Sequence, residues 1–281
     1  MLPPLKIRGR VFEWGRRPYL VGVLNITPDS FSDGGLYLAR DAALRRTEDL
    51  IEAGADIIDV GGESTRPFAR PVPVEEELRR VIPVIEAIRN RFEEIPLSVD
   101  TYKAKVAEEA LLAGADIVND ISAMRFDPEM AKVVARNKAP VILMHMKGTP
   151  QTMQVDPTYE DVLQEIKNFF EERVSFAEEN GIGREKIILD PGIGFGKRFE
   201  DNLKIIKQVE YFKTLRLPVM LGPSRKSFLG QIVGKEAAER DPATMAVVAY
   251  ATLKGVDLLR VHNVSMAKDV ILVMEALKEV Q

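Results

Sequence analysis

The sequence predicts an α/β fold of the TIM-barrel type, in which eight parallel (βα) units follow a short N-terminal β-hairpin. Eight short apolar runs recur along the chain, and stretches with helical periodicity separate them. The length of 281 residues suits such a barrel, whose usual size is ~250 residues. A doubly wound open sheet is the alternative, because periodicity does not show closure. We expect one domain over residues 1–281, with the hairpin at about 5–18 and the barrel at about 19–281.

The elements follow in chain order. Residues 5–18 read as the hairpin, with "RGR" (8–10) as its turn. The runs that follow are apolar on both faces, which is typical of parallel strands covered by helices. They are "YLVGVLN" (19–25), "DIIDV" (56–60), "PLSVD" (96–100), "DIVND" (116–120), "PVILMHM" (140–146), "KIILD" (186–190), "PVMLG" (218–222) and "DLLRVH" (257–262).

The segments between these runs read as helices. "EEELRRVIPVIEAIRNRF" and "YEDVLQEIKNFFEERVSFAEEN" place apolar residues at a period of 3.6. A weak internal echo marks the junctions, in "EAGADIID", "LAGADIVND" and "LKGVDLLRVH". In each, a Gly is suited to end a helix in the left-handed conformation, and an Asp opens the next strand.

Composition excludes several classes of protein. The net charge of −4 gives no sign of a nucleic-acid surface, and the absence of cysteine excludes disulfides and thiolate metal sites. The start "MLPPLKIRGR" has no apolar signal-peptide core, and no run of about 18 apolar residues follows it. We therefore expect a soluble, cytoplasmic protein that binds neither nucleic acid nor membrane.

Polar residues occupy the carboxyl ends of the predicted strands. A lone strand-end Asp usually caps a helix or a turn, but a polar group at every strand end is not explained by capping. A barrel brings these ends together on one face, which is where enzymes of this fold carry out their chemistry. This set therefore predicts an active site. Its members are Asn25, Asp59 with Glu63, Asp100, Asn119 with Asp120, His145, Asp190, Lys226 in "SRKS", and Arg260 with His262.

Two kinds of binding chemistry can be separated in this set. Asp100, Asn119, Asp190 and Lys226 suit a planar heterocycle with amide and amino edges, because a carboxylate can accept two N–H bonds. Hydroxyls and Arg forks suit a phosphate, and the chain offers both. The anion-binding candidates are Ser64, Thr65, Arg66, Arg260 and His262, with Arg225 as a further one. We infer a flat polar ring joined to a phosphate, with a hard oxygen-bound metal such as Mg²⁺.

Two other readings of the motifs fail. "PGIGFGKR" has neither the spacing and hydroxyl of a P-loop nor the third Gly of a dinucleotide fingerprint, whose place Lys197 takes. The two histidines lie far apart in the sequence and do not form a zinc or iron cluster.

At these residues the chain resembles the dihydropteroate synthase family, from about residue 19 to about residue 275. The motifs that carry the resemblance occur in order: "NITPDSFSDGG", "GADIIDVGGESTRP", "SVDTYK", "ADIVNDIS", "HMKGTPQTMQ", "DPGIGFGK", "GPSRKSFLG" and "RVH". The resemblance implies a barrel enzyme of folate biosynthesis that uses Mg²⁺, is usually a homodimer and is a sulfonamide target. It implies a transferase that joins 6-hydroxymethyl-7,8-dihydropterin pyrophosphate to p-aminobenzoate, giving 7,8-dihydropteroate and pyrophosphate.

The resemblance also implies roles for individual residues. Those for the pterin ring are Asp100, Asn119, Asp190 and Lys226, with Met144 and Gly192 as pocket walls. Those for pyrophosphate are Asn25, which would also ligate Mg²⁺, and Thr65, Arg66, Arg260 and His262. Those for p-aminobenzoate are Phe31, Pro67, Phe195 and Ser227. Asp100, Lys226, Arg260 and His262 would act in catalysis, and a lid would contain Thr27, Pro28, Asp29, Ser30 and Asp33.

The chain departs from the family pattern at Phe68, where Gly is frequent, and at Asn263, where Asp is common. Three alternatives stay open. One is a pterin-binding methyltransferase that acts on methyltetrahydrofolate, and another is a pterin-binding paralogue without turnover. The third is a class I aldolase with Lys226 as nucleophile, which is disfavoured because neighbouring Asp residues favour the charged amine.

Overall fold

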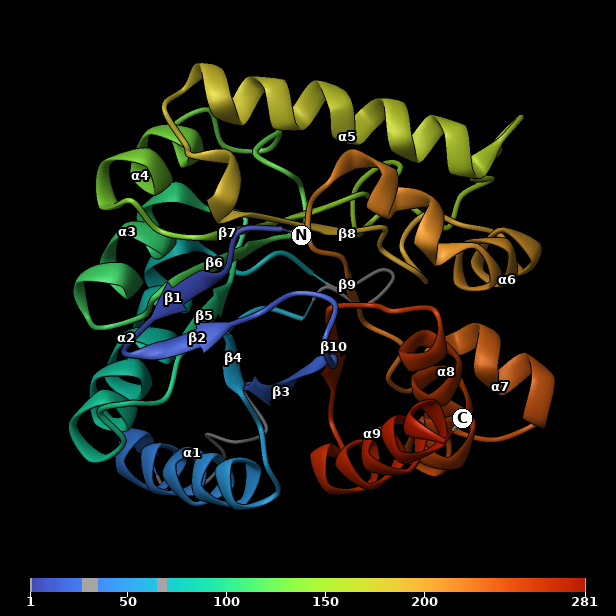
Figure 1. Cartoon of the computed structure of the whole chain (residues 1–281). Coiled ribbons are helices and arrows are strands. Elements are labelled where there is room, and N and C mark those ends of the chain that lie inside the picture. Colours follow the sequence, from blue (N-terminus) through green and yellow to red (C-terminus); the bar gives the residue numbers. More distant parts are fainter. Residues whose placement is uncertain (1, 27–34, 65–69, 281) are drawn as a thin grey trace.

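The computed structural model describes the backbone of residues 2–26, 35–64 and 70–280, and their side chains except at 35–39. Parallel strands form an inner sheet and the helices surround it (Figure 1). The strand order is β8-β7-β6-β5-β4-β3-β10-β9. A bridge between Leu189 and Val219 joins the two end strands, and Leu189 N donates to Pro218 O at 2.9 Å. The sheet therefore closes into a barrel, which confirms the predicted fold and excludes the open sheet.

All eight predicted barrel strands are present, and the main difference is a shorter strand within 218–222. The barrel strands are β3 (Tyr19–Asn25), β4 (Ile57–Gly61), β5 (Leu97–Asp100), β6 (Ile117–Asp120), β7 (Val141–Met144), β8 (Ile187–Asp190), β9 (Met220–Leu221) and β10 (Leu258–Val261). The helices are α1 (Gly35–Glu52), α2 (Val74–Arg91), α3 (Ala104–Leu112), α4 (Met130–Asn137), α5 (Val162–Glu179), α6 (Phe199–Lys207), α7 (Ser227–Val233), α8 (Asp241–Leu253) and α9 (Val264–Glu279).

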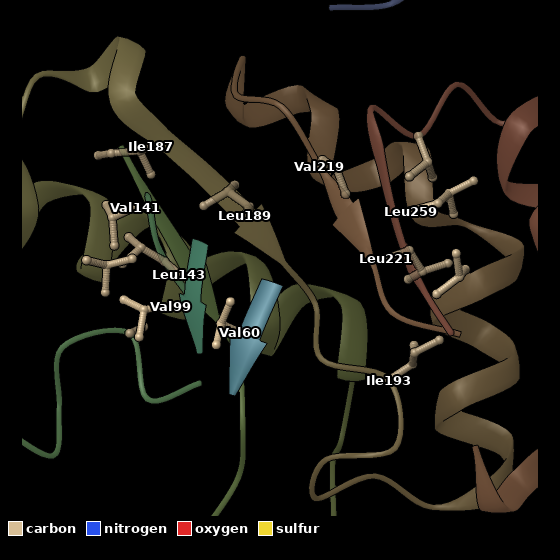
Figure 2. Close-up of a cluster of buried hydrophobic side chains, with 14 of the residues drawn as sticks. Val60, Val99, Val141, Leu143, Ile187, Leu189, Ile193, Val219, Leu221 and Leu259 are labelled. Carbon is tan, nitrogen blue, oxygen red and sulfur yellow. The ribbon is translucent and has the colours of Figure 1, made fainter. Parts of the chain in front are cut away.

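Alternate residues of each strand face the helices and form the main core. Val60, Val99, Leu143 and Leu189 belong to this layer and are fully buried (Figure 2). The amphipathic helices press their apolar sides onto these residues, as the periodicity of their sequences predicts. The outward-facing residues of the strands thus form the core together with the helices. The inward-facing residues are therefore available to fill the barrel and to line a site.

The Gly-Asp echo at the helix-to-strand junctions has a structural role. Gly54, Gly114 and Gly255 all have positive φ, at 100°, 115° and 71°. Each following Asp accepts a backbone N–H from the neighbouring strand: Asp56 from Leu20 (2.8 Å), Asp116 from Leu97 (3.0 Å) and Asp257 from Val219 (2.9 Å). These carboxylates hold the amino ends of adjacent strands together, at the end opposite to the predicted site.

The hairpin closes that same end of the barrel. β1 (Leu5–Ile7) and β2 (Arg10–Phe12) pair antiparallel around a turn in which Arg8 and Gly9 have positive φ, which confirms the predicted hairpin. It lies across the end of the barrel, inside the ring of helices (Figure 1). Its side chains pack on the lowest layer of inward residues, which comprises Tyr19, Val21, Ile57, Ile117, Ile142, Ile188, Met220 and Leu258. An apolar plug therefore seals this end, and substrates must enter from the other.

No helix among the described residues is long and apolar enough to cross a membrane.

Candidate active site

The strand register sets side chains of the predicted site beside one another. Asn25 pairs with Gly61, Gly61 with Asp100, and Asp100 with Asn119 across four adjacent strands. Met144 pairs with Asp190 on the next two. Because residues in register on parallel strands point to the same face, these side chains form one layer inside the carboxyl end of the barrel.

A buried ionic network lies just below and beside this layer. Arg260 donates from Nε to Asp59 Oδ2 at 2.6 Å and from Nη2 to Asp100 Oδ2 at 2.7 Å. Asp59 also accepts from Ser98 Oγ, and from Asn119 Nδ2 at 3.2 Å. Burial lowers the pKa of Arg260, but the charges of Asp59 and Asp100 outweigh it and raise that pKa overall. Arg260, predicted to meet pyrophosphate, thus lies among the predicted ring-binding residues.

Asp100 is the member of this network with unused hydrogen-bonding capacity. Its Oδ1 is buried and has no partner among the described residues. Burial raises the pKa of Asp100 to about 7, although the charge of Arg260 opposes the shift. An unpartnered buried acceptor is costly, so a ligand that donates an N–H here would relieve that cost.

Lys226 faces the same interior, at the start of α7. Its Nζ lies 4.1 Å from the centroid of the Phe195 ring. The sequence led us to expect that nearby Asp residues favour the charged amine, and this is wrong in its net direction. Burial, together with the charge of Arg260, lowers the pKa of Lys226 to about 8 and outweighs Asp190 and Asp100. Lys226 can therefore exchange a proton near neutral pH.

The other wall of the site is apolar. Met144 is buried in a cluster with Ile121, Met146 and Met153, against which Phe195 packs. Gly192 follows Asp190, whose Oδ1 accepts its N–H at 2.8 Å. A Cβ on Gly192 would overlap the carbonyl oxygen of the residue after Met144, so only Gly allows this approach. Burial raises the pKa of Asp190, against the opposing bond from Gly192 N and the charge of Lys226.

His262 and its surroundings form the rim near β10. His262 Nδ1 lies 2.8 Å from Ser224 Oγ, and its carbonyl accepts from Arg46 at 2.8 Å. Arg225 forms two bonds to Asp241, at 2.8 and 2.9 Å. That guanidinium is committed to an ion pair, which removes the chief reason to regard Arg225 as an anion ligand. Ser227 is exposed and begins α7.

Part of the predicted site lies outside the described residues. These positions are Thr27, Pro28, Asp29, Ser30, Phe31, Asp33, Thr65, Arg66 and Pro67, together with the departure at Phe68. The residues that flank the second segment are described. Lys103 Nζ pairs with the carboxylate of Glu63 and donates to Val72 O at 2.6 Å, so one ammonium joins both sides of that loop.

The sequence alone assigns no specific role to two buried residues, Asp59 and Lys197. Asp59 alternates with Ile57 and Gly61 along β4, and this alternation is the signal that could have placed it inside the barrel. Lys197 was considered only within a failed phosphate motif, yet its side chain is buried. Asp120 accepts Ser122 N at 2.7 Å and Met124 N at 2.8 Å, so it holds the turn after β6.

A metal would find few protein ligands here. No group of three or more His, Cys, Asp or Glu side chains within the described residues is arranged to hold a metal ion. Asn25, at the exposed end of β3, offers a side-chain oxygen 3.7 Å from where a Cβ on Gly61 would lie. Such a donor suits a cation that keeps most of its coordination for water and phosphate oxygens, as Mg²⁺ does.

Comparison with known proteins agrees with this geometry. Residues 21–262 match the family described as pterin binding enzyme. A dihydropteroate synthase of Synechocystis sp. is 46% identical over 276 residues, which cover 98% of this chain and 95% of the relative. A Yersinia pestis dihydropteroate synthase solved with a sulfonamide drug has a TM-score of 0.93 and 39% identity, covering 99% of this chain and 100% of that one. A Xanthomonas albilineans dihydropteroate synthase solved with 4-aminobenzoic acid has a TM-score of 0.92 and 42% identity, covering both chains completely.

Proposed function

The chain belongs to the pterin-binding enzymes and is a dihydropteroate synthase, and from this premise we propose which of its side chains bind each substrate. The methyltransferase, aldolase and non-catalytic alternatives give way to this function. The observation that carries the ring site is the buried, unpartnered Oδ1 of Asp100, because it needs an N–H donor that a pterin ring can supply.

The pterin ring binds inside the carboxyl end of the barrel. Asp100 and Asp190 accept its N–H groups, and Lys226 donates to a ring acceptor. Because Asn119 Nδ2 is already bonded to Asp59, the amide presents its oxygen to the ring. Met144 and Gly192 form a wall of the pocket. Calorimetric titration with a dihydropterin tests this site: Asp190→Asn should weaken binding at least about tenfold, and unchanged affinity would contradict the assignment.

The chemical step is dissociative in this proposal. The bond between the pterin methylene and the pyrophosphate oxygen breaks first, and its electrons leave with pyrophosphate. The ring spreads the positive charge, which the buried carboxylates of Asp100 and Asp190 stabilise electrostatically. The amine of p-aminobenzoate then forms the new C–N bond and loses a proton, without a covalent enzyme intermediate. Positional isotope exchange in the pyrophosphate without p-aminobenzoate supports this order, and its strict absence argues for direct displacement.

Pyrophosphate lies at the rim of the barrel, between β3 and β10. Asn25 supplies the protein ligand for Mg²⁺, and Thr65, Arg66 and His262 complete the anion site together with the N–H groups of Arg260 that do not bond Asp59 or Asp100. When bound, Mg²⁺ neutralises charge on the departing pyrophosphate. Asn25→Ala should raise the Mg²⁺ concentration needed for half-maximal rate, while binding of a pterin without pyrophosphate stays the same.

The p-aminobenzoate site lies outside the pterin, against Phe195 and Ser227. Phe31 and Pro67 complete it, and residues 27–35 act as a lid that closes over both substrates. Phe31→Ala should raise the KM for p-aminobenzoate much more than the KM for the pterin substrate. Equal effects on both would contradict the lid.

The protein functions as a homodimer in this proposal. Large apolar side chains are exposed along one stripe of α9, at Met266, Val273 and Leu277, and on the adjacent α8 at Tyr250 and Leu253. α8 and α9 pack side by side, and Tyr250 Oη donates to Lys207 O at the end of α6. Exposed apolar side chains gathered on one face of a helix, as on α9, are typical of a protein interface.

A further inference from the structure

Lys197 is a buried lysine to which the reaction assigned above gives no part. It follows β8 in the loop "PGIGFGKR", and it is 3% exposed. Its Nζ lies 3.0 Å from His145 Nδ1, 3.0 Å from Phe195 O and 3.2 Å from His145 O. Burial lowers the pKa of Lys197 well below its usual value, while the three acceptors around Nζ match the three N–H donors of its ammonium form.

The contact with Lys197 bears on the protonation of His145. Where Lys197 Nζ donates to His145 Nδ1, that ring nitrogen carries a lone pair and the imidazole is neutral with its proton on Nε2. His145 is 6% exposed, and burial lowers its pKa well below the usual value, with the charges of Lys197, Arg125 and Lys147 acting in the same direction. Burial thus favours the neutral imidazole, the form that can accept from Lys197, just after β7.

The loop that carries Lys197 rests directly on the loop after β7. A Cβ on Gly192 would overlap His145 O, and a Cβ on Gly196 would overlap Lys147 O. Tyr159 Oη donates to Gly196 O at 2.5 Å. With glycines at these contacts, no side chain separates the two backbones, so polar bonds must set their relative position. From one buried atom, Lys197 supplies two of these bonds, to His145 Nδ1 and His145 O, and a third within its own loop to Phe195 O.

We propose that Lys197, held by His145, is a positioning residue for the p-aminobenzoate site. Lys197 holds the Phe195 carbonyl and thereby fixes where the Phe195 ring lies. That ring lies 4.1 Å from Lys226 Nζ and packs against the cluster around Met144. The proposal rests on the assignment of Phe195 to the p-aminobenzoate site. It adds that the wall is held in place from behind by a lysine that touches neither substrate.

Steady-state kinetics of matched variants test the proposal. Lys197→Met keeps most of the side-chain volume but removes all three donors, and should raise the KM for p-aminobenzoate about tenfold, with the dissociation constant of the pterin unchanged. His145→Leu should behave similarly. His145→Asn, which can keep an acceptor at the δ position, should stay near wild type. Lys147→Met, at a half-buried neighbouring lysine that pairs with Glu165 and does not contact Phe195, is the control and should leave both constants unchanged.

The outcomes separate this proposal from the assigned function. Unchanged KM for p-aminobenzoate in Lys197→Met, or an equal loss for both substrates, would overturn the positioning role. A wild-type protein that makes no dihydropteroate would instead contradict the function itself.

A second measurement does not depend on turnover. The chain has only two histidines, so ¹⁵N spectra of the imidazoles are readily assigned with a His262→Gln variant. At pH 7, His145 should be neutral with an unprotonated Nδ1, and Lys197→Met should shift the Nδ1 resonance. A protonated Nδ1 in the wild-type protein would overturn the proposal.

Discussion

The Nε of Arg260 lies 2.6 Å from Oδ2 of Asp59, a carboxylate with no exposed surface, one layer beneath Asp100. The same carboxylate accepts from Asn119 Nδ2 at 3.2 Å. Asp59 therefore orients two side chains at once. It engages the Asn119 amide through Nδ2, and it places the Arg260 guanidinium where a second N–H reaches Asp100. A buried group that does not reach the pocket thus organises the residues proposed to bind the pterin.

Replacing Asp59 with Asn should weaken pterin binding strongly. The substitution keeps the size of the side chain but leaves Arg260 with one carboxylate and frees the Asn119 amide to rotate. Breaking a buried pair costs about 3–5 kcal/mol, which is divided between folding and binding. We expect dihydropterin affinity to fall at least about tenfold by calorimetry. Asp120→Asn is the control, because it removes another fully buried carboxylate that only holds a turn, and should lower stability alone.

Pterin binding should depend on pH through Asp100. Its pKa is raised to about 7 in the free protein, so the carboxylate is charged above that pH and increasingly protonated below it. Because the charged form accepts the ring N–H, the dissociation constant of a dihydropterin should rise as pH falls below about 7, approaching tenfold per unit. In Asp100→Asn the affinity is lower and the step near pH 7 should be missing. A step that persists in this variant would assign the titration to another group.

The hairpin should affect stability without affecting chemistry. Phe12 is buried in the apolar plug at the amino end of the barrel, far along the strands from the site. Phe12→Ala should lower the free energy of unfolding by about 3–5 kcal/mol. Denaturant titration measures this loss, and both KM values should stay unchanged at a temperature where the variant is folded. A selective change in one KM would show that the plug also shapes the site.

The exposed stripe of α9 should be required for dimer formation. Leu277 is 63% exposed, and Leu277→Glu places a charge within the apolar stripe, near the end of α9. Analytical ultracentrifugation should find a dimer for the wild type and a monomer for this variant. Leu112→Glu, at a residue that is 72% exposed on α3, should remain dimeric. A wild-type monomer at micromolar concentration would refute the dimer.

The features that could be predicted from the sequence are those that depend only on the order of residues along the chain. Strands have a period of two and helices a period of 3.6, so their positions were predictable, and the strand ends then had to meet on one face. Closure was not predictable, since it depends on the Leu189–Val219 bridge between segments with no shared sequence signal.

The sequence predicted which residues line the site better than it predicted how their side chains are arranged there. Asp100, Asn119, Asp190 and Lys226 were named correctly as neighbours of one interior, but the position of Arg260 between Asp59 and Asp100 depends on side-chain geometry. The net direction of the pKa of Lys226 was wrong because the sequence indicates nearby charges but not burial. Lys197 was overlooked because its acceptors are mainly backbone carbonyls, which leave no trace in residue identities.

The central claim is that this barrel end clamps a pterin for transfer to p-aminobenzoate. The most direct measurement incubates the purified protein with dihydropterin pyrophosphate, labelled p-aminobenzoate and Mg²⁺, and follows labelled dihydropteroate. We predict product for the wild type, and a loss of at least about a hundredfold in Asp190→Asn with the fold retained. Full activity in Asp190→Asn, or no product from a wild-type protein that still binds pterin, would contradict the account.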